Sequence, residues 1–498
     1  MKLNQENIDI LRSKLVPKQS NFIGNKDVIP LSEKELEVIS PIDGKVFSTI
    51  AASCTEDVDH AVTLARKTFN SGVWADMPPK ERKIILLKWA DLIESNALRI
   101  AVLGVRDNGT EINMAIKGEP KTAADVIRFY AEAIDKINGE ITPTSHEVLS
   151  LIQKEPVGVV GVILPWNFPL MVGTWKIAPA LAAGNSVVLK PSEEASLSLI
   201  EVAKLAADAG MPSGVLNVIT GEGHIVGQAL ATHMEVDVIA FTGSGSIGRK
   251  LLEYSARSNM KRVYLELGGK SPNIVFADAP DLDRAARDTA QSIFRNSGQV
   301  CVSASRLMIE EPIYEDFLNA VAQHASSLVV GDPLNLKNTT GSMANINQLE
   351  KTINAVVKAK EQGARLVTGG RRLHRESGGY YHEPTIFADV KSEMDISQQE
   401  IFGPVLAARS FKSEEQVYNI ANETIYGLSS VIWTSNMSRA HRSIKAIRSG
   451  TVQVNCYSGA DITSPLGGHK QSGSGHDRSL HAFNKYINLK SAWINIGS

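Results

Sequence analysis

The stretch VDVIAFTGSGSIGRK, residues 236–250, decides the fold. Its first half is a short run of branched and aromatic residues typical of a buried strand, and its second half opens a helix. Between the two, Gly243, Gly245 and Gly248 satisfy the pattern G-x-G-x-x-G in the strand–turn–helix setting that this pattern requires. Glycines let the backbone approach a pyrophosphate, and the helix N-terminus favours its negative charge. The stretch therefore predicts an α/β domain that binds a dinucleotide.

The chain on both sides of this stretch alternates strands and helices. Short runs rich in branched residues read VGVVGVIL, SVVLK, VLNVIT and RVYLEL, and helical stretches such as 197–209 lie between them. This alternation predicts a parallel, doubly wound sheet of the Rossmann type. After Gly269 the pattern repeats in NIVFA, RLMIE, RLVTGG, VLAARSF, SSVIWT and TVQVN. A second α/β domain is therefore expected over residues 269–470.

The first part of the chain adds helices and β-prone segments to this frame. Residues 36–50 alternate apolar and polar around Asp43-Gly44 and predict a hairpin, and a helical pattern runs from Pro78 to Asp107. A second helix is expected at about 121–136. The first domain is assigned to residues 1–137 and 157–268.

A β-prone ribbon is expected between these helices and the first strand of the sheet. The stretch NGEITPTSHEVLSLIQKEP is polar at alternate positions, and the tail HAFNKYINLKSAWINIGS has the same character. The two segments, residues 138–156 and 484–498, are predicted to pair. They form a candidate arm for contact with another subunit, and a plain surface hairpin is the alternative interpretation.

Composition excludes several classes of protein. At 498 residues the chain is too long for one compact core, and 43% apolar residues suffice for two or three. With Lys+Arg at 52 and Asp+Glu at 54, the net charge of −2 argues against a nucleic acid or a polybasic membrane contact. Three scattered cysteines argue against a disulfide framework and against a zinc site, so no metal is expected.

The N-terminus and the most apolar run indicate the compartment. The start, MKLNQENIDILRSK, has no apolar core of a secretory signal. The most apolar run, residues 157–173, is interrupted by Pro165, Asn167 and Pro169, which argues against a membrane span. These features predict a cytoplasmic enzyme.

The stretch RNSGQVCVSASR, residues 295–306, carries the candidate nucleophile Cys301. Small residues surround this cysteine, so a substrate carbon can approach it. Taken alone, a single cysteine indicates a buried core thiol. Glu266 in YLELGGKSPN and Asn167 in ILPWNFP change that interpretation. A thiol, a carboxylate base and an amide donor together form a set of groups for attack on a carbonyl.

Two carboxylates compete for the role of ribose ligand. The simple dinucleotide fingerprint would assign it to Glu266, which follows the glycine turn. Glu193 in SVVLKPSE is preferred, because it comes directly after an earlier strand and beside Lys190, at the edge where such sheets bind ligands. The alternative for Glu193 is an acid that interacts with a helix N-terminus.

Seven motifs in one order carry a resemblance that covers nearly the whole chain. They read PWNFP, KPSE, FTGS, ELGGKSPNIVFADAP, GQVC, EIFGPV and PLGGHKQSG, and together they resemble the aldehyde dehydrogenase superfamily. The resemblance implies a Rossmann-type coenzyme domain, an α/β catalytic domain and a β-ribbon that joins subunits into dimers or tetramers. It also implies Cys301 as nucleophile, Glu266 as general base and Asn167 as oxyanion donor.

The same resemblance implies the contacts of coenzyme and substrate. NAD is expected as coenzyme, with NADP possible at lower efficiency, and the matching positions are Trp166, Lys190, Glu193, Gly243, Ser244, Gly248, Glu400 and Phe402. The aldehyde pocket is expected from Phe168, Met171, Val172, Trp175, Val300, Val302, Asp461 and Leu466.

Four positions depart from the pattern of the superfamily. Thr110 and Glu111 stand where many relatives read Lys-Pro, in a segment that borders the substrate tunnel of the family. Gly245 stands where Thr is usual. Leu466 stands where Phe is common, which suggests a wider pocket floor.

The substrate class follows from a narrower likeness. FYAEAIDKINGE, SNMKRVYLELGGKSPNIVFADAPDL and HKQSGSGHDRSLHAF resemble the γ-glutamyl-γ-aminobutyraldehyde and ω-aminoaldehyde dehydrogenases of polyamine breakdown. The expected reaction is NAD-dependent oxidation of such an aldehyde to an acid, through a cysteine thiohemiacetal and a thioester. Asp461 is the acid that could face a substrate amine, and a solvated loop acid is its alternative.

Other functions stay open at this stage. One is a broad-specificity aliphatic or aromatic aldehyde dehydrogenase. Two from other classes are a Cys-dependent hydrolase, which leaves the glycine turn and KPSE unexplained, and a non-catalytic protein that keeps the fold.

Overall fold

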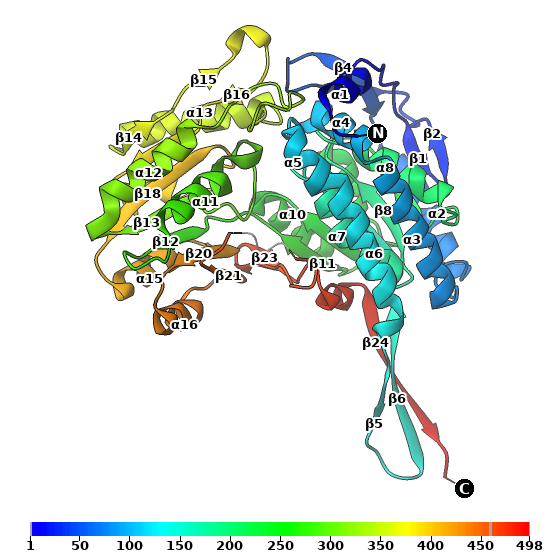
Figure 1. Ribbon diagram of the computed structural model, residues 1–498. Coiled ribbons are helices and arrows are strands. Elements are labelled where there is room, and N and C mark those ends of the chain that lie inside the picture. The colour runs from blue at the N-terminus through cyan, green and yellow to red at the C-terminus, as the bar shows by residue number, and fades with distance from the viewer. Residues whose placement is uncertain (1, 458–460, 498) are drawn as a thin grey trace.

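The computed structural model describes residues 2–457 and 461–497 as two sheets flanked by helices, with a ribbon that projects from one side (Figure 1). The first sheet has the order β2-β1-β9-β8-β7-β10-β11-β23. Its central strands are parallel, as the alternating pattern predicted, and have the bounds β7 (Val159–Ile163), β8 (Ser186–Lys190), β9 (Leu216–Val218), β10 (Val238–Thr242) and β11 (Arg262–Glu266). The edges are antiparallel and consist of β1 (Asn21–Ile23), β2 (Lys26–Val28) and β23 (Gly473–Ser474).

Burial on both faces explains why β7 is apolar throughout and why β8 is apolar between its two end residues. Every residue of β7 and β8 is buried. Successive side chains of a strand point to opposite faces, so Val160 and Val162 join one core cluster while Val159 and Ile163 join another. The helix α7 (Pro169–Ala182) packs into the first cluster and α2 (Thr55–Asn70) into the second. Two helix layers therefore cover the sheet.

The second sheet has the order β14-β17-β18-β13-β12-β20-β21 and is parallel except at β14. Its strands are β12 (Pro272–Val275), β13 (Arg306–Glu310), β14 (Arg365–Thr368), β17 (Thr385–Ala388), β18 (Val405–Phe411), β20 (Ser429–Trp433) and β21 (Thr451–Val454). The short strand β17 has no counterpart in the sequence prediction. Helices of this half are α11 (Leu282–Phe294), α12 (Tyr314–Ser326), α13 (Ile346–Glu361), α14 (Asp395–Gln398), α15 (Glu414–Asn422) and α16 (Met437–Ala446).

The helical stretch expected from Pro78 to Asp107 is two helices, α3 (Pro79–Ser95) and α4 (Ala97–Asn108). The break is at Asn96, whose backbone leaves helical geometry at φ −102° and ψ 10°. Its side chain donates to the carbonyl of Leu92 at 2.8 Å, a local bond that competes with the helical ladder.

The remaining elements near the N-terminus agree with the prediction in kind. The hairpin is β3 (Glu35–Ile39) and β4 (Val46–Ala51), and the expected helix at about 121–136 begins as α6 (Thr122–Ala133). Other helices are α1 (Gln5–Arg12), α5 (Ile112–Ile116), α8 (Leu197–Asp208), α9 (Gln228–Thr232) and α10 (Gly245–Ala256). Among the helices of the described ranges, none has both the length and the apolar character needed to cross a membrane.

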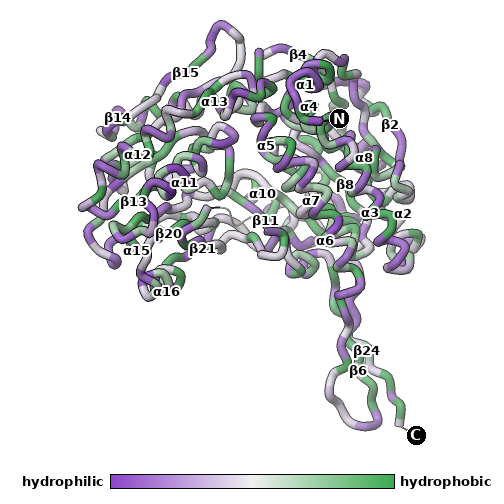
Figure 2. Tube along the Cα trace, viewed as in Figure 1, coloured by the Kyte–Doolittle hydropathy of each residue, from purple (hydrophilic) through white to green (hydrophobic). Residues whose placement is uncertain are grey.

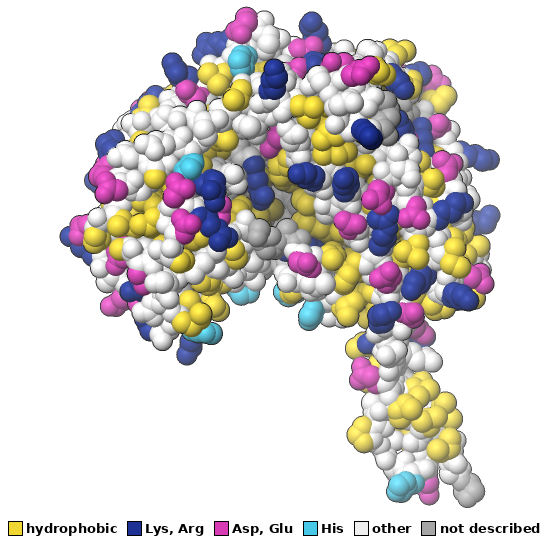
Figure 3. All heavy atoms as spheres, viewed as in Figure 1, with side chains coloured by type: hydrophobic (Ala, Val, Ile, Leu, Met, Phe, Trp, Pro, Cys, Tyr) yellow, Lys and Arg dark blue, Asp and Glu magenta, His cyan; other side chains and the backbone are white. Residues whose placement is uncertain are grey.

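The projecting ribbon is a three-stranded sheet that joins distant parts of the chain (Figure 1). It consists of β5 (Glu140–Thr142), β6 (Val148–Pro156) and β24 (Ile487–Asn495), and β24 pairs with β6 along its whole length, as predicted. Apolar residues lie along the arm (Figure 2), and Figure 3 shows hydrophobic side chains gathered on its outer half. Trp493 is 68% exposed, and the other large exposed hydrophobics of the arm are Ile141, Leu489, Ile494 and Ile496.

Candidate active site

A cavity of about 510 Å³ brings most of the predicted site residues together. The turn after β10 contributes Gly243 and Ser244 to its wall, and the loop after α11 contributes Cys301. Because one wall comes from the first sheet and another from the second domain, the cavity connects the glycine turn with the thiol.

The loop that carries Cys301 has an unusual backbone conformation, which hydrogen bonds to buried residues hold in place. Asn296 and Ser297 lie in the left-handed region, at φ 48° and 51°. The Thr110 hydroxyl donates to the side-chain carbonyl of Asn296 at 2.8 Å, and the backbone N–H of Asn296 donates to Glu111 at 3.2 Å. Thr110 and Glu111 are buried and do not line the cavity, whereas Met114 of the same segment does. They support the loop, and such bonds offset the cost of left-handed residues.

Asn167 lies on the turn that leads into α7 and lines the cavity. Its amide nitrogen donates to the carbonyl of Gln299 at 2.9 Å, and Asn296 donates to its backbone carbonyl at 3.3 Å. One N–H of an amide group suffices for the first bond, so the geometry leaves a second donor. A hydrogen-bond donor fixed in the same cavity as the thiol is suited to stabilise the oxyanion that forms when a thiol attacks a carbonyl.

The Cys301 thiol is half-buried. Burial first, and then the carboxylates of Glu400 and Glu266, raise its pKa to about 12. The sulfur of the ligand-free protein is therefore a thiol at neutral pH, and it must lose a proton before or during attack.

Glu266 ends β11 and lies behind the cavity wall, which is formed by the next residues, Leu267 and Gly268. Within the described residues, its Oε1 atom has no hydrogen-bond partner. Burial and then the charge of Asp477 hold the pKa of Glu266 well above its usual range, against the opposing charges of Lys176 and Lys485. The carboxylate is thus near enough to affect the thiol electrostatically, and it does not line the cavity in this conformation.

A buried ion cluster stands behind Glu266. Asp477 forms ion pairs with both Lys176 and Lys485, and all three side chains are almost fully buried. Burial raises the pKa of Asp477, but the two lysines outweigh it and hold that pKa below its usual value.

The coenzyme end of the cavity is lined by Trp166, Gly243, Ser244, Glu400 and Phe402. The rings of Trp166 and Phe402 meet edge to face, with centroids 5.3 Å apart. The Ser244 side chain caps α10, accepting from the N–H of Ile247 at 3.4 Å. Glu400 accepts from the N–H of Gly269 at 3.0 Å.

Gly248 is expected to bind coenzyme, but it does not line the cavity. A Cβ there would lie 2.9 Å from the side chain of Leu267, so the glycine allows α10 to approach β11. A helix N-terminus placed this close to the sheet edge fits the pyrophosphate of a dinucleotide.

Lys190 and Glu193 lie at the carboxyl end of β8 and outside the cavity lining. The Lys190 ammonium is 2.7 Å from Glu193, and the N–H of Gly223 donates to the other carboxylate oxygen at 3.1 Å. Burial raises the pKa of Glu193, but the charge and hydrogen bond of Lys190 outweigh it and keep that pKa below its usual value. An ionised, oriented carboxylate at this edge suits the hydroxyls of a ribose.

Seven of the eight residues expected in the aldehyde pocket line the cavity, namely Phe168, Met171, Val172, Trp175, Val300, Val302 and Leu466. Asp461 does not. It is exposed, and its carboxylate accepts from the N–H of Thr463 at 2.8 Å and from the Thr463 hydroxyl. Asp461 is thus occupied by its own turn, and its neighbours 458–460 lie outside the described residues.

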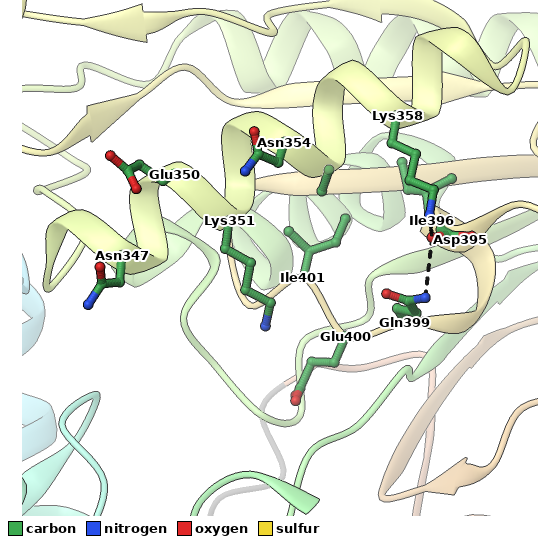
Figure 4. Close-up of a pocket in the computed structure, with 11 residues that line it drawn as sticks. Asn347, Glu350, Lys351, Asn354, Lys358, Asp395, Ile396, Gln399, Glu400 and Ile401 are labelled. Carbon is green, nitrogen blue, oxygen red and sulfur yellow. Dashed lines mark hydrogen bonds and ion pairs between the residues drawn. The ribbon is translucent and has the colours of Figure 1, made fainter. Parts of the chain in front are cut away.

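Several lining residues escaped the sequence analysis. Arg295 stacks on the ring of Tyr457 at 5.2 Å, and Arg478 on the ring of Trp175 at 5.3 Å. Gln348 and Lys351 of α13 line the coenzyme end. Figure 4 shows Lys351 and Glu400 directed into the same space, a neighbouring groove of about 450 Å³. Others on the wall are Met114, Gly118, Thr122 and Thr242. Thr242, Arg295 and Arg478 stand within or beside quoted motifs, but their spacing in the sequence does not show that they line one cavity, because residues of distant segments meet here only after folding.

The comparisons with known proteins identify the family of the chain. Residues 29–492 match the model of the aldehyde dehydrogenase family. The chain is 45% identical to the NADP/NAD-dependent aldehyde dehydrogenase PuuC of Escherichia coli over 475 residues, 95% of each chain.

Two solved structures superpose closely. An indole-3-acetaldehyde dehydrogenase in complex with NAD⁺ has a TM-score of 0.98 and 45% identity, covering 99% of this chain and all of its own. A γ-glutamyl-γ-aminobutyraldehyde dehydrogenase of Burkholderia cenocepacia has a TM-score of 0.97 and 44% identity over the same shares. These matches confirm the expected fold and likeness, and the chain belongs to the aldehyde dehydrogenase family.

Proposed function

We propose that the protein oxidises an aldehyde to a carboxylic acid with NAD⁺, through a thioester on Cys301. One observation carries the proposal: Cys301, Asn167 and the glycine turn after β10 open into a single cavity. A hydrolase would need the thiol and a base, and it would have no use for the connection to the glycine turn.

The nucleophile acts first. The Cys301 sulfur loses its proton and bonds to the aldehyde carbon, and the carbonyl oxygen becomes negative. The free N–H of Asn167 and the backbone N–H of Cys301 are the donors proposed to stabilise this oxygen. Bound NAD⁺ supplies the hydride acceptor that the oxidation requires. The acyl group then remains on Cys301 as a thioester.

Glu266 is proposed to serve the second half of the reaction. It takes a proton from water, whose oxygen attacks the thioester carbon, and the carboxylic acid leaves as the thiol is restored. The raised pKa of Glu266 suits this role, because a base is most effective when its pKa is near the working pH. Since Glu266 lies behind the wall, its side chain must rotate, or water must come to it.

The residues proposed to hold the coenzyme lie at the other end of the cavity and at the carboxyl edge of the first sheet, outside the cavity lining. Ser244 and the start of α10 would face the pyrophosphate, and Glu193 with Lys190 the ribose of the adenosine. Trp166, Glu400 and Phe402 would enclose the nicotinamide end. NADP is the weaker coenzyme in this proposal.

Charge at the aldehyde end favours one substrate class over another. Arg295 and Arg478 line the cavity, whereas Asp461 does not. A bare ω-ammonium group would meet like charge here. The γ-glutamyl group of γ-glutamyl-γ-aminobutyraldehyde ends in a carboxylate as well as an ammonium, so it can pair with an arginine. We therefore favour a γ-glutamylamino aldehyde of polyamine breakdown over a simple ω-aminoaldehyde.

A matched set of aldehydes tests this function. Incubation with NAD⁺ should produce NADH absorbance, which a hydrolase or a non-catalytic protein would not give. γ-Glutamyl-γ-aminobutyraldehyde should exceed a neutral acylamino aldehyde of equal length by several-fold in kcat/KM, about 1 kcal/mol for a partly solvated charge pair. Equal kcat/KM values for the two aldehydes would show that the shape of the pocket alone determines which substrate is preferred. That result would favour the broad-specificity alternative.

The coenzyme preference is a separate prediction. Glu193→Gln should narrow the preference for NAD⁺ over NADP⁺ by about tenfold in kcat/KM, because the variant no longer repels a 2′-phosphate. Lys190 remains in both proteins and moderates the repulsion. Steady-state kinetics with both coenzymes measure the ratio, and a ratio unchanged by the substitution would show that Glu193 does not face this part of the coenzyme.

The ribbon supports a further proposal about assembly. We propose that β5, β6 and β24 pack against a second copy of the chain, because the arm exposes large apolar side chains that a lone subunit leaves in water. Replacing Trp493 and Leu489 with Ser should lower the mass in solution, measured by light scattering. A wild-type protein that is monomeric at micromolar concentration would contradict the proposal.

A further inference from the structure

A second, very small cavity lies behind the Cys301 loop. Its volume is about 10 Å³, close to what one water molecule needs. Lys270, Ser303 and Glu400 are among the residues that line it. Gly269, next to Lys270, touches the loop: a Cβ there would lie 2.6 Å from the carbonyl oxygen of Cys301.

Lys270 is an unusual residue to find at this depth. It is 2% exposed, and within the described residues its Nζ atom has no hydrogen-bond partner. The hydroxyl of Ser303, on the same cavity, also lacks a partner in the described part of the chain. Burying an amine that has no hydrogen-bond partner costs free energy of folding, so hydrogen bonding within the fold does not explain why a lysine stands here. The proposed reaction does not use Lys270, and its presence needs another explanation.

Glu400 lines both the small cavity and the large one, as Val300 and Phe402 also do. Burial raises its pKa, and the N–H of Gly269 and the charges of Lys351 and Lys270 oppose that effect. Lys351 approaches Glu400 from α13, on the groove side (Figure 4). Lys270 shares the small cavity with Glu400.

Other charged and titratable groups of the described residues interact with Lys270, Glu400 and Cys301. The Cys301 thiol and the Tyr426 hydroxyl both respond to the charge of Glu400, and Arg306 acts on Lys270. Glu266 acts on Cys301. Lys270 is therefore a buried cation that shares the small cavity with Glu400.

We propose that Lys270 is a positioning residue that keeps Glu400 ionised for coenzyme binding, acting across the small cavity it shares with Ser303. The proposal rests on the proposed role of Glu400 in holding the nicotinamide ribose. A carboxylate accepts hydrogen bonds from ribose hydroxyls, and a neutral carboxyl group is a poorer acceptor. The buried amine would thus be retained for binding, although it weakens the fold.

The pH dependence follows from this arrangement. Burial, with Arg306, lowers the pKa of Lys270 to about 7 against the attraction of Glu400. Below neutral pH the ammonium is present and keeps Glu400 ionised as acid is added. Without the ammonium, Glu400 takes up a proton at a higher pH. In a protein that lacks the ammonium, the loss of NAD⁺ affinity on acidification should therefore begin at a higher pH than in wild type.

Lys270→Met tests the proposal, because it keeps the length of the side chain and removes the charge. The dissociation constant of NAD⁺ is measured by calorimetry from about pH 5.5 to 8.5, without aldehyde. The midpoint of the acid-side loss of affinity should rise by about one pH unit, as expected on removing one nearby opposite charge. In a Glu400→Gln background the same substitution should change the dissociation constant by less than about twofold, since the group it acts on is gone.

Thermal unfolding of the coenzyme-free protein distinguishes a positioning role of Lys270 from a structural role. Lys270→Met should melt no lower than wild type, because Nζ has no bond to lose. The matched control is Lys261→Met: this buried lysine donates to Ala231 at 2.6 Å and to Ser258 at 3.0 Å, far from the site in the fold. It should lower the melting temperature and leave the pH dependence of NAD⁺ affinity as in wild type.

Two outcomes would overturn the inference. One is a Lys270→Met protein that fails to fold or melts well below wild type, which would make the lysine a structural residue. The other is an unchanged pH dependence of NAD⁺ affinity. Wild-type turnover of an aldehyde tests the proposed function separately, so its failure would be distinguishable from either outcome.

Discussion

Cys301→Ala is expected to lower kcat/KM for aldehyde oxidation by about four orders of magnitude or more. The substitution removes the atom that bonds to the substrate carbon, and loss of a nucleophile in other enzymes costs at least that much. NADH formation measures the loss. Labelling by iodoacetamide should disappear from the peptide that contains residue 301, and NAD⁺ binding should stay within about threefold of wild type, because the coenzyme contacts lie on other elements.

The two remaining cysteines supply matched controls for this prediction. Cys54 lies at the start of α2, where its thiol bonds to Asp57 at 3.2 Å, and Cys456 lies in a half-buried loop. Neither lines the large cavity. Cys54→Ala and Cys456→Ala should each keep kcat/KM within about twofold of wild type. Substantial activity in Cys301→Ala, with either control inactive, would place the nucleophile elsewhere.

The fold was largely predictable because its signals are local. The strands β7, β8, β10 and β11 are short apolar runs with helices between them, and a parallel sheet covered on both faces requires this pattern. The pairing of β24 with β6 was predictable from matching β-prone character. The break at Asn96 was not, since it depends on one side-chain bond that does not interrupt the apolar spacing.

The site was predictable where residues lie in motifs and not where they meet by folding. Cys301, Asn167, Gly243 and Phe402 line one cavity, as their motifs implied. Asp461 was placed in the pocket by its position in the chain, but its carboxylate bonds to Thr463 in its own turn and does not line the cavity. The spacing of motifs along the chain also cannot show whether a residue lines the cavity or lies behind its wall.

Burial behind the cavity wall, and contacts between distant parts of the chain, explain the other differences between the predicted and the observed site. Glu266 is one residue before the cavity wall, and sequence spacing does not separate the wall from the layer behind it. Thr110 and Glu111 contact Asn296, more than a hundred positions later in the chain. Arg295 and Arg478 come from separate loops, and only the folded chain brings both to the aldehyde end.

Glu266→Gln is expected to lower steady-state turnover by about a hundredfold or more, because it should slow hydrolysis of the thioester without preventing its formation. General base catalysis contributes about 10²–10⁴ in rate, and the amide has the shape of the carboxylate without its basicity. Attack by Cys301 should still occur, so the variant should release a burst of NADH equal to about one per active thiol. The acyl group should then remain on Cys301, where mass spectrometry of acid-quenched protein detects it.

The pH profile makes this prediction specific to the base. The pKa of Glu266 is raised, so its basic form is lost as pH falls through that raised value, and wild-type hydrolysis should slow well above pH 4.5, the ordinary value for a glutamate. In Glu266→Gln the hydrolytic step has no such group, so its residual rate should be flat over this range. If the variant shows no trapped acyl group and retains the wild-type acid limb, another group activates the water. The position of Glu266 behind Leu267 and Gly268 makes that result informative: a base that cannot reach the cavity would leave turnover unchanged, whereas one that rotates into it would give the burst.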